Sequence, residues 1–213
     1  MNLPLHAETP LFPSPLPLDL RHEAFARRRR IGDVELSDAA VDDFNALLAR
    51  LAPGTAPVSA DQIVTLARWL QSLPAERAAA IVGERLRRAA RVRDMLADTD
   101  WILDGNLRER ARLLVDYLQR VDDLIPDDQP QVGHLDDALL VELSWRQFAA
   151  EATDFGDFCR FRALERPRGD GRARVAAWEA ACVAELALLQ QRRDVRAHRY
   201  ATGGDLPERI RVR

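Results

Sequence analysis

Apolar residues recur at spacings of three and four along most of this chain, and this period constrains the fold more than any other feature. In the first such segment Val41, Phe44 and Leu48 share one helical face. The pattern returns between successive Pro, Gly and Asp turn signals, so the sequence predicts an all-α bundle of about seven helices. The expected helices begin near Ser37, Ser59, Pro74 and Leu107, span about Leu135–Ala150 and Asp154–Leu164, and include Val175–Leu189.

Local signals place several helix ends. Ser59 and Gln62 form the capping-box pattern at the start of the second helix. Pro53 and Gly54 end the first helix, and Pro74 stands where a first helical turn tolerates proline. The helix expected over about Leu135–Ala150 is apolar nearly all round, which predicts a central, buried position. Trp145 is therefore expected in the core.

Three regions are expected along the chain. Residues 1–30 form an arm that is Pro-rich and then Arg-rich, residues 31–195 form one helical domain, and residues 196–213 form a C-terminal tail. The prolines of the arm favour an extended chain lying in a surface groove, with a PxxP-type ligand as the alternative. The run Arg27–Arg30 is expected to be a solvated face, with phosphate contact as the alternative.

Composition excludes several classes of protein. The net charge is −3, so no overall basic field attracts nucleic acid. All 31 basic residues are arginine, which is typical of GC-rich bacterial codon usage. Cys159 and Cys182 are too few for a disulfide framework. Neither a secretory signal nor an apolar run of membrane-spanning length occurs, so a cytoplasmic location is expected.

The distinctive element is an acidic segment, residues 122–137, here called the acidic turn. It contains six aspartates and no Arg or Lys. A close pair of like charges is worth about 1 to 4 kcal/mol, so six carboxylates cannot pack together without screening. The sequence therefore requires water, a metal ion or arginines from elsewhere in the chain.

The acidic turn resembles a known family. Asp-Leu-Ile-Pro-Asp, then Pro130, then Val-Gly and Leu-Asp-Asp are similar to the signature of the YkvA-like bacterial proteins, a domain of unknown function. The resemblance covers about residues 118–143, within an element expected over 118–146. It implies a small helical domain in which the turn joins two packed helices, and no activity. Asp128, Gln129 and Gln131 stand where the family is usually apolar, and His134 where it often has an aromatic residue, which weakens any membrane association.

A structural role explains most of the acidic turn. Pro126 and Pro130 prevent a helix, and Gly133 is expected where a side chain would obstruct the backbone. Asp123 can accept hydrogen bonds from amides two residues on. The pair Asp136–Asp137 falls in the first turn of the following helix, where the helix dipole favours carboxylates.

A divalent metal site is the alternative role. Carboxylates suit Mg²⁺, Mn²⁺ or Ca²⁺, whereas an EF-hand starting at Asp128 fails because Pro130, Val132 and Leu139 replace ligands. No cofactor is expected, because backbone amides and solvent are expected to satisfy the turn, so that a chelator leaves the melting temperature unchanged. The candidate ligands are Asp123, Asp127, His134, Asp136 and Asp137.

No catalytic motif stands out, and no small-molecule substrate is identifiable. A non-enzymatic interaction or structural module is the first hypothesis, with another protein or a second copy as the partner. A metal-dependent hydrolase using the carboxylates of Asp123–Asp137 is the second. Nucleic-acid binding through Arg27–Arg30 and the third helix is the third, and the sparse aromatics count against it.

Arginines are expected to neutralise the acidic turn. The third helix, Pro74–Leu96, carries three more basic than acidic residues. Planar guanidinium groups match carboxylates, so Asp123 and Asp137 are expected to pair with arginine. The arginines that share one sector of that helix are Arg77, Arg87, Arg88 and Arg91.

Overall fold

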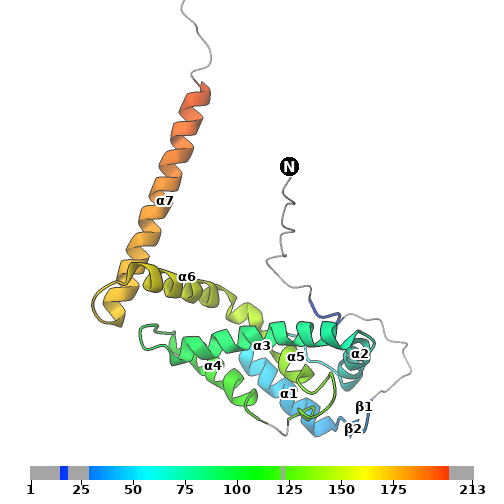
Figure 1. Ribbon diagram of the computed structural model, residues 1–213. Helices are drawn as coiled ribbons and strands as arrows, with labels where there is room; N and C mark the ends of the chain where they lie inside the picture. The colour runs from blue at the N-terminus through cyan, green and yellow to red at the C-terminus, as the bar shows by residue number, and fades with distance from the viewer. Residues whose placement is uncertain (1–14, 19–28, 121–122, 202–213) are drawn as a thin grey trace, which may run out of the picture. The chain divides into compact units, whose positions relative to one another are not determined.

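The computed structural model describes residues 15–18, 29–120 and 123–201 (Figure 1). Seven α-helices and one short 3-10 helix lie within them, which confirms the all-α prediction. The elements are β1 (Arg30–Ile31), β2 (Val34–Glu35), α1 (Asp38–Leu51), α2 (Ala60–Gln71), α3 (Ala75–Ala97), α4 (Gly105–Tyr117), α5 (Leu135–Ser144), η1 (Trp145–Gln147), α6 (Ala149–Glu165) and α7 (Gly171–Ala201). None of these helices has both the length and the hydropathy of a membrane-spanning segment.

Helices α1 and α2 begin where the sequence signals predicted. Ser37 Oγ accepts the Ala40 amide at 3.1 Å at the start of α1. Ser59 and Gln62 form the expected capping box on α2, and the Asp104 carboxylate accepts two amides at the start of α4. These local hydrogen bonds satisfy donors that the first helical turn leaves free, so they fix each boundary without tertiary contacts.

Four boundaries differ from the prediction, and one of them is the start of the sixth helix, which lies at Ala149 and not near Asp154. The fourth helix ends at Tyr117, short of Val121. The fifth ends at Ser144 instead of near Ala150, because Ser144 Oγ donates to the Leu140 carbonyl and a 3-10 turn follows. The expected tail from residue 196 is still helical, since α7 runs to Ala201.

Helix α5 forms the centre of the bundle, as expected. It contacts α3, α1 and α4, and each residue from Leu135 to Val141 is buried. A helix buried on every side must be apolar all round, and Ala138–Val141 supply that surface. The first turn of α5 nevertheless contains two buried aspartates, Asp136 and Asp137, which become the centre of the site described below.

One ion pair joins α3 to α5 in this core. Arg85 is only 2% exposed, and its Nε donates to Glu142 Oε2 at 3.1 Å. Arg88 Nη1 donates to the same oxygen at 3.2 Å. Arg88, one of the four arginines expected to share a sector beside the acidic turn, is thus directed to Glu142, together with Arg85. Removing one partner of such a pair leaves a buried charge, so this contact ties α3 firmly to α5.

Trp145 does not belong to the core. It lies in η1 with part of its surface exposed, and the Arg88 guanidinium lies 5.2 Å from the centre of its ring. Phe148 is fully buried in its place. The early end of α5 changes the direction of the following side chains, and this shift explains why the expected core residue was wrong.

The contacts divide the chain after Phe155 into two compact units, where the sequence favoured one domain over residues 31–195. The first unit contains the bundle from β1 to the start of α6. In the second unit α6 packs on α7 through Phe158 and Trp178, whose ring centroids are 6.1 Å apart in an edge-to-face arrangement.

The N-terminal arm lies largely outside the described residues. Within the described part, Leu16 is buried, and β1 and β2 pair as a short antiparallel hairpin. Arg29 pairs with Asp38 at 2.6 Å, so one of the four consecutive arginines contacts the start of α1. Arg27 lies outside the described residues.

Candidate functional site

The acidic turn connects α4 to α5 through successive tight turns, as its prolines predicted. The Gln129 amide donates to the Pro126 carbonyl at 3.1 Å, and the Gly133 amide donates to the Gln129 carbonyl at 2.9 Å. Gln131 takes the left-handed backbone conformation, with φ of 65°. This path brings the chain back on itself, so Asp127 lies beside the residues that begin α5.

Gly133 is required by space, as expected of a position that a side chain would obstruct. A β-carbon placed on Gly133 would lie 2.1 Å from the carbonyl oxygen of Asp127. Because the obstacle is backbone, it cannot rotate away. The close approach of the Gly133 backbone to the Asp127 backbone holds Asp127 next to His134.

Asp136 organises the other side of the turn. Its Oδ2 accepts the Tyr117 hydroxyl at 2.8 Å and the amides of Leu124 and Ile125 at 3.2 Å each. The expectation that Asp123 would accept amides two residues on is wrong, because the carboxylate of Asp136 has taken the Ile125 amide. Asp136 thus joins the end of α4, the acidic turn and the start of α5.

Five carboxylate oxygens in the described part of the turn are buried and accept no hydrogen bond. Asp127 Oδ1 at least lies next to His134 Nδ1. The other four are Asp123 Oδ1, Asp123 Oδ2, Asp136 Oδ1 and Asp137 Oδ1. Asp136 is 0% exposed and Asp137 5%. The expectation that backbone amides would satisfy the turn fails for these atoms. Leaving a buried acceptor without a donor costs about 1–3 kcal/mol, and more when it is charged.

Arginines do not neutralise the cluster. Among the described residues, no ion pair joins an arginine to Asp123, Asp127, Asp136 or Asp137. The prediction that Asp123 and Asp137 pair with arginine is therefore wrong. Arg85 and Arg88 of α3 do point inward, but both of them pair with Glu142 of α5.

Burial and mutual repulsion perturb the carboxyls strongly. Burial first, and the charge of Asp136 second, raise the pKa of Asp123 to about 7. Burial also raises the pKa of Asp136 to about 6, against the hydrogen bond from Tyr117 that lowers it. Burial and the charge of Asp123 raise the pKa of Asp137 to about 6. Each carboxyl holds its proton well above its ordinary range, as expected of like charges without a counter-ion.

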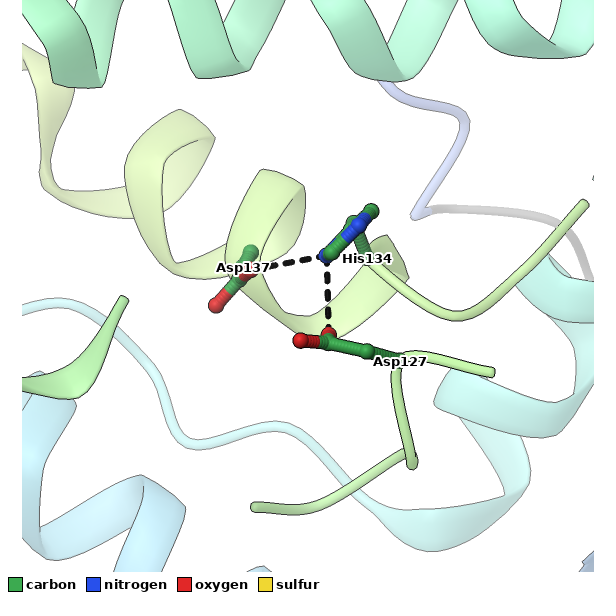
Figure 2. A group of neighbouring side chains, drawn as sticks. All are labelled: Asp127, His134 and Asp137. Atoms are coloured by element: carbon green, nitrogen blue, oxygen red, sulfur yellow. Dashed lines mark ion pairs between the residues drawn. The ribbon is translucent and has the colours of Figure 1, made fainter. Parts of the chain in front are cut away.

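Among the described residues, His134 is the basic side chain that pairs with the carboxylates of this site, and it is charged only when protonated. Its Nδ1 lies 2.8 Å from Asp127 Oδ1 and 3.4 Å from Asp137 Oδ2. Figure 2 shows the imidazole between the two carboxylates, one from the turn and one from α5. The side chain of His134 is 47% exposed whereas that of Asp137 is 7% exposed, so the group runs from the surface into the interior.

The geometry fits a cation. One oxygen from each of Asp123, Asp136 and Asp137 lies within 4.8 Å of the others, and Asp127, His134 and Asp137 form a second such group. Because metal–oxygen bonds are about 2.0–2.6 Å long, ligand atoms around one ion lie no more than about 5 Å apart. Three carboxylates suit a hard ion such as Mg²⁺, Mn²⁺ or Ca²⁺, and Asp137 is shared by both groups.

A cavity of about 220 Å³ opens beside the second group. Its walls are largely apolar, from α3 and α4, and His134 and Asp137 reach it from the start of α5. Arg93 also lines it. The buried group of Asp123, Asp136 and Asp137 has only Asp137 on this cavity.

The other residues that the sequence singled out lie outside the carboxylate cluster. Asp128 and Pro130 are exposed at the outside of the turn, and Pro126 is partly exposed. Neither of the two cysteines, both of which the structure describes, is in a disulfide. Tyr117 and Glu142 matter to this region and were not expected from the sequence. Glu142 could have been noticed, because it is the one charge in the apolar stretch after Asp137, whereas no local signal marks Tyr117.

Set against known protein families, curated proteins and solved structures, the chain has no match. The resemblance of residues 118–143 to the YkvA-like proteins stays a prediction. The chemistry of the acidic turn follows from its own geometry.

Proposed function

We propose that this protein is a non-enzymatic helical interaction module whose acidic turn binds one divalent cation between Asp123, Asp136 and Asp137. The observation that carries the proposal is that four buried oxygens of Asp123, Asp136 and Asp137 accept no hydrogen bond and pair with no arginine among the described residues. A cation of charge two would balance the carboxylates and replace the missing donors in one step.

Protons are the competing solution. Three carboxyls with a pKa of about 6 to 7 would share protons below neutral pH, and each shared proton would donate to a neighbouring oxygen. Above pH 7 this solution fails, because the protons leave and the repulsion remains. The cation is therefore needed in the pH range in which the carboxyls have lost their protons. Its binding is expected to strengthen as the pH rises.

Burial favours a structural role for the cation. Asp136 and Asp137 are 0% and 5% exposed, so two of the three ligands of an ion held at this site are buried. The ion would connect the chain just after α4 to the first turn of α5. Since α5 is the centre of the bundle, fixing its first turn stabilises the whole first unit. The YkvA-like resemblance, which implies a turn joining two packed helices, agrees with this role.

Thermal unfolding tests the proposal. The full chain is stripped with a chelator at pH 8 and melted with Ca²⁺, Mg²⁺ or Mn²⁺ added singly. At about 100 times the dissociation constant an ion adds ~2.7 kcal/mol, which raises the melting temperature by roughly 5–10 °C. The double variant Asp123→Asn/Asp137→Asn should lose this rise, and the exposed neighbour Asp128→Asn should keep it. An unchanged wild-type melting temperature with all three ions would refute the proposal.

A metal-dependent hydrolase is the second candidate, and the cavity beside His134 and Asp137 favours it. An ion held by Asp127, His134 and Asp137 would face this cavity, where it could activate water. Turnover of p-nitrophenyl phosphate with Mn²⁺ that disappears in His134→Ala would support the hydrolase. Its absence, with the thermal response intact, supports the structural role.

A further inference from the structure

Helix α7 presents a long surface that its own unit does not cover. The helix, drawn in Figure 1, extends over 31 residues. Each residue from Val183 to Ala197 is exposed. Leu186 is 66% exposed, Val183 67% and Leu189 44%. Such large apolar side chains in sequence on one helix mark an interaction surface more than a solvated one.

The apolar residues of α7 form a stripe on one side of the helix. At 100° per residue, Val175, Cys182 and Leu189 share one line, because positions seven apart differ by only about 20°. Leu186 lies on the adjacent line of the same stripe. Phe158 contacts Trp178 near the start of α7, so the packing on α6 is confined to that end.

Two opposite charges interrupt this stripe at matched positions. Glu179 lies seven residues before Leu186, and Arg193 lies seven residues after it. Both therefore lie on nearly the same line as Leu186. Val183 and Leu189 are likewise placed symmetrically, three residues before and after. The stripe is thus complementary to itself when one copy is reversed about Leu186.

We infer that α7 pairs with α7 of a second copy of this chain as an antiparallel two-helix coiled coil centred on Leu186. In this arrangement Glu179 faces Arg193 of the second copy, and the twofold axis makes the same pair twice. Val183 faces Leu189 of the second copy, so the apolar centre is covered. The inference specifies the partner in the interaction role proposed above, and it involves none of the residues of the acidic turn.

Charge selects the direction of the pair. In a parallel, in-register pair Glu179 would face Glu179 and Arg193 would face Arg193, and like charges at such positions are destabilising. The antiparallel pair replaces two repulsions with two attractions. Leu188 and Val195, which are also exposed, lie on the far side of the helix, where no such symmetric charge pattern accompanies them.

The molar mass of the full chain in solution tests the inference. A monomer has a mass of 24.0 kDa, and sedimentation or light scattering should show twice this value. Leu186→Glu should give a monomer, whereas Leu188→Glu, on the far side of the same helix, should leave the dimer intact. A monomeric wild type at all concentrations, or a dimer broken by the Leu188 change and kept by the Leu186 change, would overturn the inference.

A charge exchange separates the two directions. Glu179→Arg alone should weaken the dimer by about tenfold or more, since it sets two arginines against each other. Adding Arg193→Glu should restore the dimer, and failure of this rescue would rule out the antiparallel pair. The measurements are made with chelator and with Mn²⁺. Helix α7 is remote in sequence from the acidic turn. If the wild type is monomeric but its melting temperature still rises with cations, the coiled-coil inference is refuted and the proposed cation site is not.

Discussion

Replacing Asp123 by asparagine should stabilise the protein at pH 8 when no divalent cation is present. The change keeps the shape of the side chain and removes one negative charge from a site that no described arginine pairs with. It also places an amide N–H donor in a group whose carboxylates lie within 4.8 Å of one another, and in which Asp136 Oδ1 and Asp137 Oδ1 accept no hydrogen bond. Substitution of a buried residue normally destabilises a protein, so a gain in stability is a discriminating outcome.

The magnitude follows from the pKa of Asp123, which burial and the charge of Asp136 raise from 3.8 to about 7. Each pH unit of such a difference corresponds to about 1.4 kcal/mol, so ionising this carboxyl costs roughly 4 kcal/mol before screening. Solvent reaches part of the side chain, and we therefore take about half, ~2 kcal/mol. For a chain of this size that is a rise of roughly 4–8 °C in melting temperature.

Melting curves in chelator at pH 8 and pH 5 provide the assay. At pH 5 the Asp123 carboxyl of the wild type is already protonated, so the advantage of Asp123→Asn should disappear. Asp128→Asn, which removes an exposed charge from the same turn, is the control and should change little at either pH. Lower stability of Asp123→Asn at pH 8, or a cation response equal to that of the wild type, would refute the account of a repulsive, cation-binding cluster.

Three further predictions concern the same unit. Without cations, the three raised carboxyl pKa values add stability below about pH 4 that is lost as the pH rises through 6 to 7, so the thermal gain from Ca²⁺ or Mn²⁺ should be large at pH 8 and small at pH 5. Glu142→Ala should lower the free energy of unfolding in urea by about 3–5 kcal/mol, because it leaves Arg85 buried without its main partner. Glu84→Ala, at a more exposed site, should change the free energy of unfolding by less than about 0.5 kcal/mol. Gly133→Ala should cost about 1–3 kcal/mol or more through the clash with the facing carbonyl, while a β-carbon at Gly105 meets nothing within 4 Å, so Gly105→Ala should be tolerated.

Local signals in the sequence determined the helices of this protein. Ser37, Ser59 and Asp104 cap the helices that follow them, and the apolar period identifies the inward faces. These features act within one or two helical turns, so no tertiary contact is needed to decide them. The central place of α5 also followed from the sequence, because a helix that is apolar on every side must be buried.

The partners of the charged residues were decided by the tertiary structure. The sequence showed an acidic turn and a surplus of arginines on the third helix, and pairing them was the natural expectation. Arg85 and Arg88 pair with Glu142 instead, because the packing of α3 on α5 sets that carboxylate nearer. Which charges meet depends on helix rotation and crossing, and neither is encoded in the spacing of residues along one helix.

In the acidic turn, too, the sequence determined some features and the tertiary structure determined others. Its prolines, Gly133 and the position of Asp136 at a helix start all followed from residue types and spacing. That Asp136 accepts from Tyr117 and Ile125, and so leaves Asp123 without a donor, required the end of α4 to lie against the start of α5. Sequence thus determined that carboxylates would gather here, whereas only the folded chain decided which of them would be buried without a partner, because burial depends on what packs against a residue.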